Sequence, residues 1–287
     1  MKIFDMRLRP PFKSIAEGMF QNSGRELFEP EVFAPRFGMR IAESAKQRSM
    51  ELCIQEMDEA GICAGAVLIR KSTAMKNEDL EELTRSYPKR FVGIAGIDPH
   101  EGKAALDEID TFVHKGVCRG VLFETGFCRP PLYADDKVLS VFYEKCEAEN
   151  IPVFISFGGF VAPDLSYTDP MIVERIALAF PKLKLIVAHG GWPFVSAICH
   201  VAFNREHVYL APDLYTMNVP GNREYLDAAN YLIPEKFMFG TAYPCVDMRQ
   251  AAAYYKQWGL RAEVIQAVMF DNAVRVLNLS DKDIAFS

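Results

Sequence analysis

The feature that most constrains the fold is a short apolar run, Leu185–Ala188, that ends in His189. Two glycines, Trp192 and Pro193 follow, and a helical pattern begins near Phe194. A short, continuous apolar run bounded by turn residues predicts a strand buried on both faces, as in a parallel sheet. His189 then stands where the strand ends, which is where a β/α barrel carries its chemistry. A histidine held only for structural reasons is the alternative.

Similar apolar runs alternate along the chain with segments of helical spacing, such as 51–60, 139–150 and 172–180. This alternation implies a parallel sheet with right-handed crossovers. Eight strand–helix units favour an α/β fold of the (β/α)8 TIM-type barrel class over an open sheet, as a single domain over residues 1–287. A final helix is expected over 261–277. The expected strands are residues 3–7, 65–70, 91–97, 120–124, 152–156, 183–189, 208–212 and 237–240.

One long segment, residues 10–41, interrupts the alternation after the first expected strand. It is rich in Pro, Gly and Phe, and its phenylalanines are Phe12, Phe20, Phe28, Phe33 and Phe37. A loop of this length inside a compact domain is usually functional. We therefore predict that it covers the barrel mouth as a lid. Packing against a neighbouring subunit of a homo-oligomer is the alternative.

Composition narrows the class of protein. A net charge of -6 without any block of basic residues argues against a nucleic-acid partner. No apolar run approaches membrane-spanning length, and the first expected strand begins too early for a signal peptide. The seven cysteines are scattered and never form a C-x-x-C pair, which favours free thiols. We expect a cytoplasmic protein with no membrane partner.

Arg7 and Arg9 give the clearest indication of a ligand. Alternation places both side chains on one face of the first strand, near its carboxyl end. Two permanent cations in a pocket call for an anion, and a planar guanidinium suits a carboxylate. The predicted partner is thus a small anionic substrate. Pairing of the arginines with Asp5 or Glu124 is the alternative.

Other polar residues fall just after expected strands. Glu124 follows the fourth, as a general base or as a counterion of an arginine, and Asp213 follows the seventh, as a proton-transfer group or a cap. Cys245 is interpreted as packing, and the Asp98-Pro-His100 sequence as a turn with a helix cap. The predicted catalytic residues are His189, Glu124 and Asp213. The predicted substrate-binding residues are Arg7, Arg9, Arg70, Ser156, Tyr215 and Tyr243.

Four segments together resemble the amidohydrolase-related branch of the metal-dependent hydrolase superfamily. They are residues 2–10 (KIFDMRLRP), 151–156 (IPVFIS), 185–193 (LIVAHGGWP) and 238–244 (MFGTAYP). The branch includes 2-amino-3-carboxymuconate semialdehyde decarboxylase and lactonases. The segments occur in the expected order, and the resemblance implies a distorted (β/α)8 barrel over nearly the whole chain.

The sequence departs from the pattern of that branch at the metal ligands. The usual His-x-His of the first strand is replaced by Arg7 and Arg9, the histidine ending the fifth strand by Ser156, and the eighth-strand aspartate by Ala242. Only His189 matches a usual ligand. Arginine stays protonated and cannot ligate zinc, so we predict no metal or other cofactor. One divalent metal bound through His189 is the alternative.

Three functions remain open from the sequence. The first is an amidohydrolase-like, metal-independent hydrolase of the lactonase type, acting on a carboxylated small molecule. The second is a carboxy-lyase (decarboxylase), as the resemblance suggests. The third is a non-catalytic barrel that binds a small anion. Fold analogy alone does not decide among them.

Overall fold

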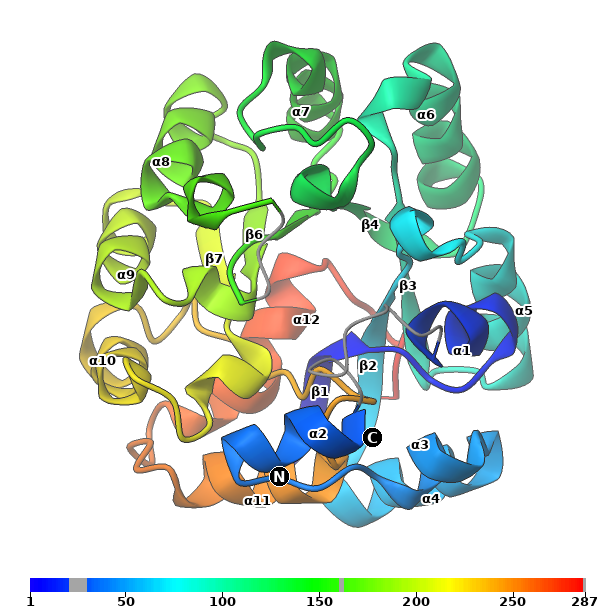
Figure 1. Cartoon of the computed structure of the whole chain (residues 1–287), viewed down its shortest axis with the longest axis vertical. Helices are drawn as coiled ribbons and strands as arrows, with labels where there is room; N and C mark the ends of the chain where they lie inside the picture. The colour runs from blue at the N-terminus through cyan, green and yellow to red at the C-terminus, as the bar shows by residue number, and fades with distance from the viewer. Residues whose placement is uncertain (21–29, 160–162, 286–287) are drawn as a thin grey trace.

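The computed structural model describes residues 1–20, 30–159 and 163–285. Seven parallel strands pair in sequence order and curl into a barrel with helices outside (Figure 1). This confirms the predicted TIM-type fold, and the expected strands match to within a few residues at their ends. The strands are β1 Ile3–Leu8, β2 Ile62–Leu68, β3 Phe91–Gly96, β4 Cys118–Phe123, β5 Val153–Ser156, β6 Leu185–Ala188 and β7 Val208–Ala211.

The eighth expected strand, residues 237–240, is not a regular strand, which corrects that prediction. It still closes the barrel, because Phe237 bridges to Leu210 of β7 and Tyr243 bridges to Leu8 of β1. The ladder is interrupted because the backbone N–H of Thr241 donates to the Asp5 side chain and not to a strand carbonyl. The result is a distorted barrel whose last element is held by side-chain contacts as much as by sheet pairing.

The helices follow one another around the ring of strands (Figure 1). Ser49 caps α4 by accepting from Leu52 N, and Gly61 ends the same helix at φ 80°. The closing helix expected over 261–277 is shorter in the structure. It contains a π-helical turn that continues directly into α12. The helices are α1 Lys13–Phe20, α2 Pro30–Phe33, α3 Glu43–Gln47, α4 Met50–Ala60, α5 Glu78–Ser86, α6 Lys103–Ile109, α7 Ser140–Ala148, α8 Pro170–Ala179, α9 Val195–Asn204, α10 Asn222–Asp227, α11 Met248–Gln257 and α12 Asn272–Val276.

Two buried clusters correspond to the two faces of the strands. The inner cluster fills the barrel and includes side chains of α12, which is seen through the ring of strands in Figure 1. The outer cluster joins strands to the surrounding helices. No helix in the described part of the chain combines the length and apolar character needed to cross a membrane.

A register shift in β1 changes the face on which the last residue of the strand lies. Phe4 and Met6 belong to the inner cluster, so strict alternation would also place Leu8 inside. The pairing with β2 shifts between Asp5 and Leu8, and Leu8 joins the outer cluster instead. An extra residue in one strand re-aims the side chains that follow it. Here it turns Leu8 outward.

The segment 10–41 is partly helical, which corrects its interpretation as a plain loop. Its described part contains α1, α2 and a 3-10 turn, Ala34–Phe37, while residues 21–29, including Phe28, lie outside the described residues. Asn218 Nδ2, after β7, donates to Phe37 O at 2.7 Å, and Lys76 N, after β2, donates to Ser14 Oγ at 2.9 Å. These contacts place it against loops at the carboxyl end of the barrel. A lid function remains a prediction.

Candidate active site

The carboxyl ends of β6 and β7 bring His189 and Asp213 together. His189 Nδ1 lies 2.9 Å from Asp213 Oδ2. The contact lacks the alignment of a hydrogen bond, since neither atom has a hydrogen-bond partner. The Asp213 side chain is fully buried, whereas 16% of the His189 side chain is exposed. The imidazole is therefore the member of the pair that a substrate can reach.

The backbone is strained where these strands end. His189 has φ 65°, Asp213 has φ 48° and Ala242, at the end of the eighth segment, has φ 58°. Non-glycine residues rarely adopt positive φ, and such residues concentrate at functional sites. These three are among ten described non-glycine residues with positive φ, and they lie together at the edge that carries the His189–Asp213 pair.

Arg7 completes this pair from β1. Its Nε lies 3.6 Å from Asp213 Oδ2, and its side chain is buried. Burial and then the Arg7 charge lower the pKa of His189 below its usual value, against the opposing effect of Asp213. His189 is thus a neutral imidazole near neutral pH, able to accept a proton.

A second group of charges forms around Glu124, at the end of β4. Arg70 Nε lies 2.9 Å from Glu124 Oε1, and Arg9 Nη2 lies 3.8 Å from the same oxygen. Arg9 Nε also donates to Leu68 O at 3.1 Å, and Ser72 Oγ donates to Glu124 Oε2 at 3.2 Å. Burial alone would raise the pKa of Glu124, but Arg70, Arg9 and Arg7 together lower it. Glu124 is accordingly a permanent carboxylate, the counterion that the sequence allowed.

Buried polar atoms without a hydrogen-bond partner are concentrated in these two groups. Among the described residues ten such side-chain atoms occur, and seven of them belong to Arg7, Arg9, Glu124, His189 and Asp213. An unsatisfied buried polar group is costly, so a group of them indicates a place where a ligand supplies the partners. We call these five residues the active-site cluster.

Aromatic side chains form a wall beside His189. Tyr215 packs edge-on against its ring at a centroid distance of 5.3 Å and stacks on Trp192 at 5.4 Å. Phe37, from the segment 10–41, packs edge-on against Tyr215 at 5.7 Å. Ser156, at the end of β5, pairs with Ala188 and so lies next to the strand that carries His189. Sequence reasoning did not single out Trp192, although it lies in the segment 185–193, or Ser72, which has no charge or motif that marks it.

Tyr243 and Asp5 do not join the cluster. The Tyr243 hydroxyl lies 2.8 Å from Ser44 Oγ and is buried there, and its role in substrate binding stays a prediction. Asp5 accepts hydrogen bonds from the backbone N–H groups of Arg7 and Thr241 and is not a counterion of the arginines. Both residues hold β1 and the eighth segment in place.

Cys245 lies near the arginines, as charge effects of Arg9 and Arg7 on it show. Burial nevertheless raises the pKa of its thiol, despite the opposing effect of those cations. A protonated thiol is a poor nucleophile. Its interpretation as a packing residue is consistent with this environment.

The donor set around His189 does not fit the metal centre of the resembling branch. Within the described ranges, His189 belongs to no group of three His, Cys, Asp or Glu ligand atoms close enough to share a cation. The Asp213 oxygen next to it also faces Arg7, whose fixed charge opposes a dication. One imidazole and one carboxylate do not complete a zinc shell.

The sequence matches the amidohydrolase family over residues 47–279. The chain belongs to this family. Its structure is similar to that of an uncharacterized TIM-barrel protein from Bordetella bronchiseptica, with 32% identity, coverage of 97% of this chain and 99% of that chain, and a TM-score of 0.90. The family membership confirms the resemblance drawn from the four sequence segments.

Two more distant structures share the fold of this amidohydrolase-family barrel. A 5-carboxyvanillate decarboxylase from Sphingomonas paucimobilis is 15% identical, with coverage of 97% and 99% and a TM-score of 0.68. A 2,6-dihydroxybenzoate decarboxylase from Rhizobium is 14% identical, with coverage of 97% and 99% and a TM-score of 0.70. At these identities the similarity shows the fold alone.

Proposed function

We propose that the protein hydrolyses a small carboxylated ester of the lactone type, with His189 as the proton-transfer group and without a metal at that residue. The observation that supports this most strongly is the concentration, in the active-site cluster, of buried polar atoms that lack a hydrogen bond, although five of the seven face an ion-pair partner. The donors among these atoms, on Arg7 and Arg9, suit the carboxylate and carbonyl oxygens of the substrate, which only accept hydrogen bonds, and the acceptors suit the attacking water.

The charges of the site suit a substrate with one carboxylate. Three guanidinium groups, those of Arg7, Arg9 and Arg70, stand against the carboxylates of Glu124 and Asp213, which leaves one positive charge in excess. Arg9 and Arg70 face Glu124 and Arg7 Nε faces Asp213, whereas Arg7 Nη1 is buried without a hydrogen-bond partner. Arg7 is therefore the group that receives the substrate carboxylate or the developing oxyanion.

Proton transfer follows from the His189–Asp213 pair. With Nδ1 at Asp213, the other ring nitrogen is left for water. Neutral His189 accepts a proton from water as the hydroxide oxygen bonds to the lactone carbonyl carbon. Asp213 stabilises the resulting imidazolium, much as the carboxylate of a hydrolytic triad does. The ring C–O bond then breaks, and His189 returns the proton to the leaving oxygen.

A carboxy-lyase is the second candidate, supported by the two decarboxylases of the same fold. The active-site cluster favours it less, because guanidinium groups that hold a carboxylate tightly also stabilise it against loss of carbon dioxide. Glu124 is held ionised by its arginines, so it is a poor acid for protonating the carbon left behind.

The two candidates separate in one assay. We expect turnover of a carboxylated lactone to its hydroxy acid, and a lower kcat/KM for the matched lactone without the carboxylate. Arg7→Met should reduce kcat/KM for the carboxylated substrate by about 10- to 100-fold, the value of a hydrogen bond to a charged group, and affect the matched lactone less. Arg7→Lys keeps the positive charge but loses the planar guanidinium with its two parallel donors, and it serves as the conservative variant.

Carbon dioxide release from a carboxylated aromatic acid, with no lactone turnover, would establish the lyase instead. Binding without either reaction would indicate a non-catalytic barrel that binds a small anion.

A further inference from the structure

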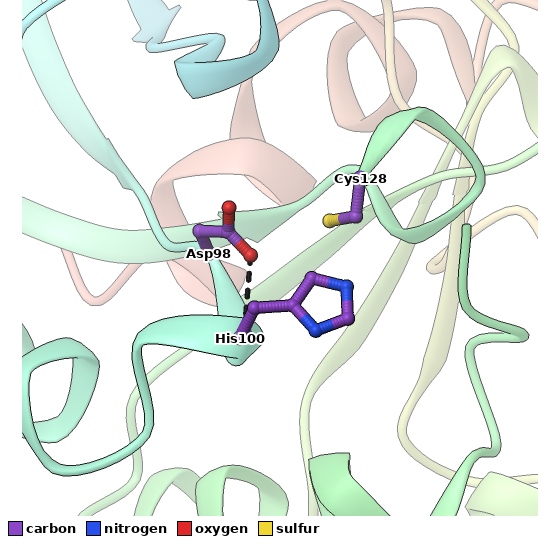
Figure 2. Close-up of side chains that lie close together, drawn as sticks. All are labelled: Asp98, His100 and Cys128. Atoms are coloured by element: carbon purple, nitrogen blue, oxygen red, sulfur yellow. Dashed lines mark hydrogen bonds between the residues drawn. The ribbon is translucent and has the colours of Figure 1, made fainter. Parts of the chain in front are cut away.

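A second group of side chains with metal-binding chemistry lies beside the active-site cluster. Asp98 follows β3, His100 is two residues further on, and Cys128 follows β4 and the turn Thr125–Phe127. One potential ligand atom from each lies within 4.8 Å of the others. Figure 2 shows the carboxylate and the thiol pointing toward one another, with the imidazole edge next to the thiol. The two turns that carry them are far apart in sequence and adjacent in the barrel.

Local hydrogen bonds fix this arrangement. Asp98 Oδ1 accepts from the backbone N–H of His100 at 3.0 Å, which confirms the predicted helix cap and leaves the second carboxylate oxygen for another partner. Cys128 Sγ donates to Glu124 O at 3.6 Å. His100 Nε2 lies 2.7 Å from Pro130 O, and its side chain is exposed, so the ring can turn to present a nitrogen to a cation shared with the carboxylate and the thiol.

We propose that Asp98, His100 and Cys128 bind a divalent transition metal of the zinc class. Thiolate, imidazole and carboxylate are the three ligand types that zinc accepts, and three protein ligands leave a fourth position open. The thiolate and the carboxylate together neutralise the dication. The ligand atoms must approach by about 1 Å to reach tetrahedral spacing, which the exposed His100 permits.

A metal held by Asp98 and Cys128 would lie at a cavity of about 220 Å³ that both residues line. Asp98, Cys128 and Glu124 line this cavity, and Glu124 Oε1 is a buried acceptor without a hydrogen-bond partner. Lys71 and Arg129 line it too. The Lys71 charge is already paired with two glutamates, whereas Arg129 reduces the affinity for a cation. The metal would tie together the turns after β3 and β4 that flank Glu124.

The other group of this kind shows why the assignment is selective. Asp110, His114 and Glu149 also place potential ligand atoms within 4.8 Å of one another. There, Lys145 Nζ lies 2.7 Å from Asp110 and 2.9 Å from Glu149 and occupies the place of a cation. That group is a surface ion-pair network, and it supplies a matched control.

Cobalt(II) titration of the full chain tests the proposal, independently of the proposed hydrolysis. We expect one equivalent to bind with a thiolate-to-cobalt charge-transfer band. Cys128→Ser should abolish the band, and His100→Gln should weaken binding by more than about ten-fold. The controls Cys245→Ser, His114→Gln and His189→Gln should retain both the band and the affinity.

Zinc competition and thermal unfolding complete the test. Zinc should displace cobalt and raise the Tm of the wild type, but not that of His100→Gln. Because His100 is exposed, this variant answers the question even if Cys128→Ser fails to fold. Absence of stoichiometric binding, absence of the thiolate band in the wild type, or loss of binding in His189→Gln with retention in His100→Gln would overturn the proposal.

Discussion

At the scale of single residues, the environment of His189 determines what its imidazole can do. The carboxylate of Asp213 is fully buried, and its Oδ2 atom faces both the His189 ring and the guanidinium of Arg7. Burial and Arg7 outweigh Asp213, and the pKa is lowered. A neutral, oriented imidazole with a permanent carboxylate behind it is suited to take a proton from water.

The lowered pKa of His189 gives a pH prediction with a definite sign. The active form is neutral, so kcat/KM falls only when pH drops through the His189 pKa, which lies below the usual value of about 6.5. Arg7→Met removes a cation that lowers this pKa, so the acidic limb should move to higher pH. His189→Gln should reduce kcat by about 10²- to 10⁴-fold. A pH–rate profile of lactone turnover in the three proteins measures this; an acidic limb that does not move in Arg7→Met would contradict the assigned role.

At the scale of elements, β1 and the eighth segment are joined through Asp5. Its carboxylate accepts from Arg7 N, Thr241 N and Thr241 Oγ1, at 2.9, 3.0 and 2.5 Å. These bonds add to the two backbone hydrogen bonds that join β1 to the eighth segment, from Met6 N to Phe239 O and from Arg9 N to Tyr243 O. They also fix the backbone of Arg7, and in this way the contact between β1 and the eighth segment supports the active-site cluster.

Asp5 predicts how stability changes with pH. Burial, against the opposing hydrogen bonds, raises its pKa from 3.8 to about 7. The folded state therefore binds a proton that the unfolded state has lost between these values, and the stabilisation present at acidic pH is lost as pH rises through about 7. Relative to Asp5→Asn, the Tm of the wild type should fall by a few degrees between pH 5 and pH 8. The surface variant Asp107→Asn should track the wild type, and parallel curves for wild type and Asp5→Asn would refute the assignment.

At the scale of the whole molecule, the barrel places two chemically different groups on one edge. Parallel strands end at the same edge, so residues after β1, β4, β6 and β7 form the active-site cluster, and residues after β3 and β4 form the proposed metal site. The two groups meet at Glu124, which lines the cavity beside the metal site and belongs to the cluster. A metal found in the purified protein would therefore not by itself imply metal-dependent hydrolysis.

Removal of any bound metal distinguishes the catalytic role of the active-site cluster from the role of the proposed metal site. We expect chelator-treated protein to keep lactone turnover within about three-fold of untreated protein, because His189, Asp213 and Arg7 supply the base and the positive charge. Elemental analysis before and after treatment should show that any zinc was lost, and Cys128→Ser should behave like the treated wild type. Turnover that disappears with the metal and returns with zinc would contradict a metal-independent mechanism.

The sequence by itself determined the class of fold and the edge of the barrel where the chemistry lies. Strand and helix periodicity are local properties, so residues near Leu185–Ala188 were sufficient to predict a buried strand ending in His189. Because the carboxyl ends of parallel strands meet, the sequence also placed Arg7, Glu124 and Asp213 at the same edge.

Only the tertiary structure decided which of these residues act together. Glu124 pairs with Arg9 and Arg70 while Asp213 pairs with His189, because packing sets distances between segments far apart in sequence. The register shift in β1 and the irregular eighth segment depend on pairing with other strands, which local periodicity does not encode. For the same reason Tyr243 turns toward Ser44, and Cys128 meets Asp98 across two turns.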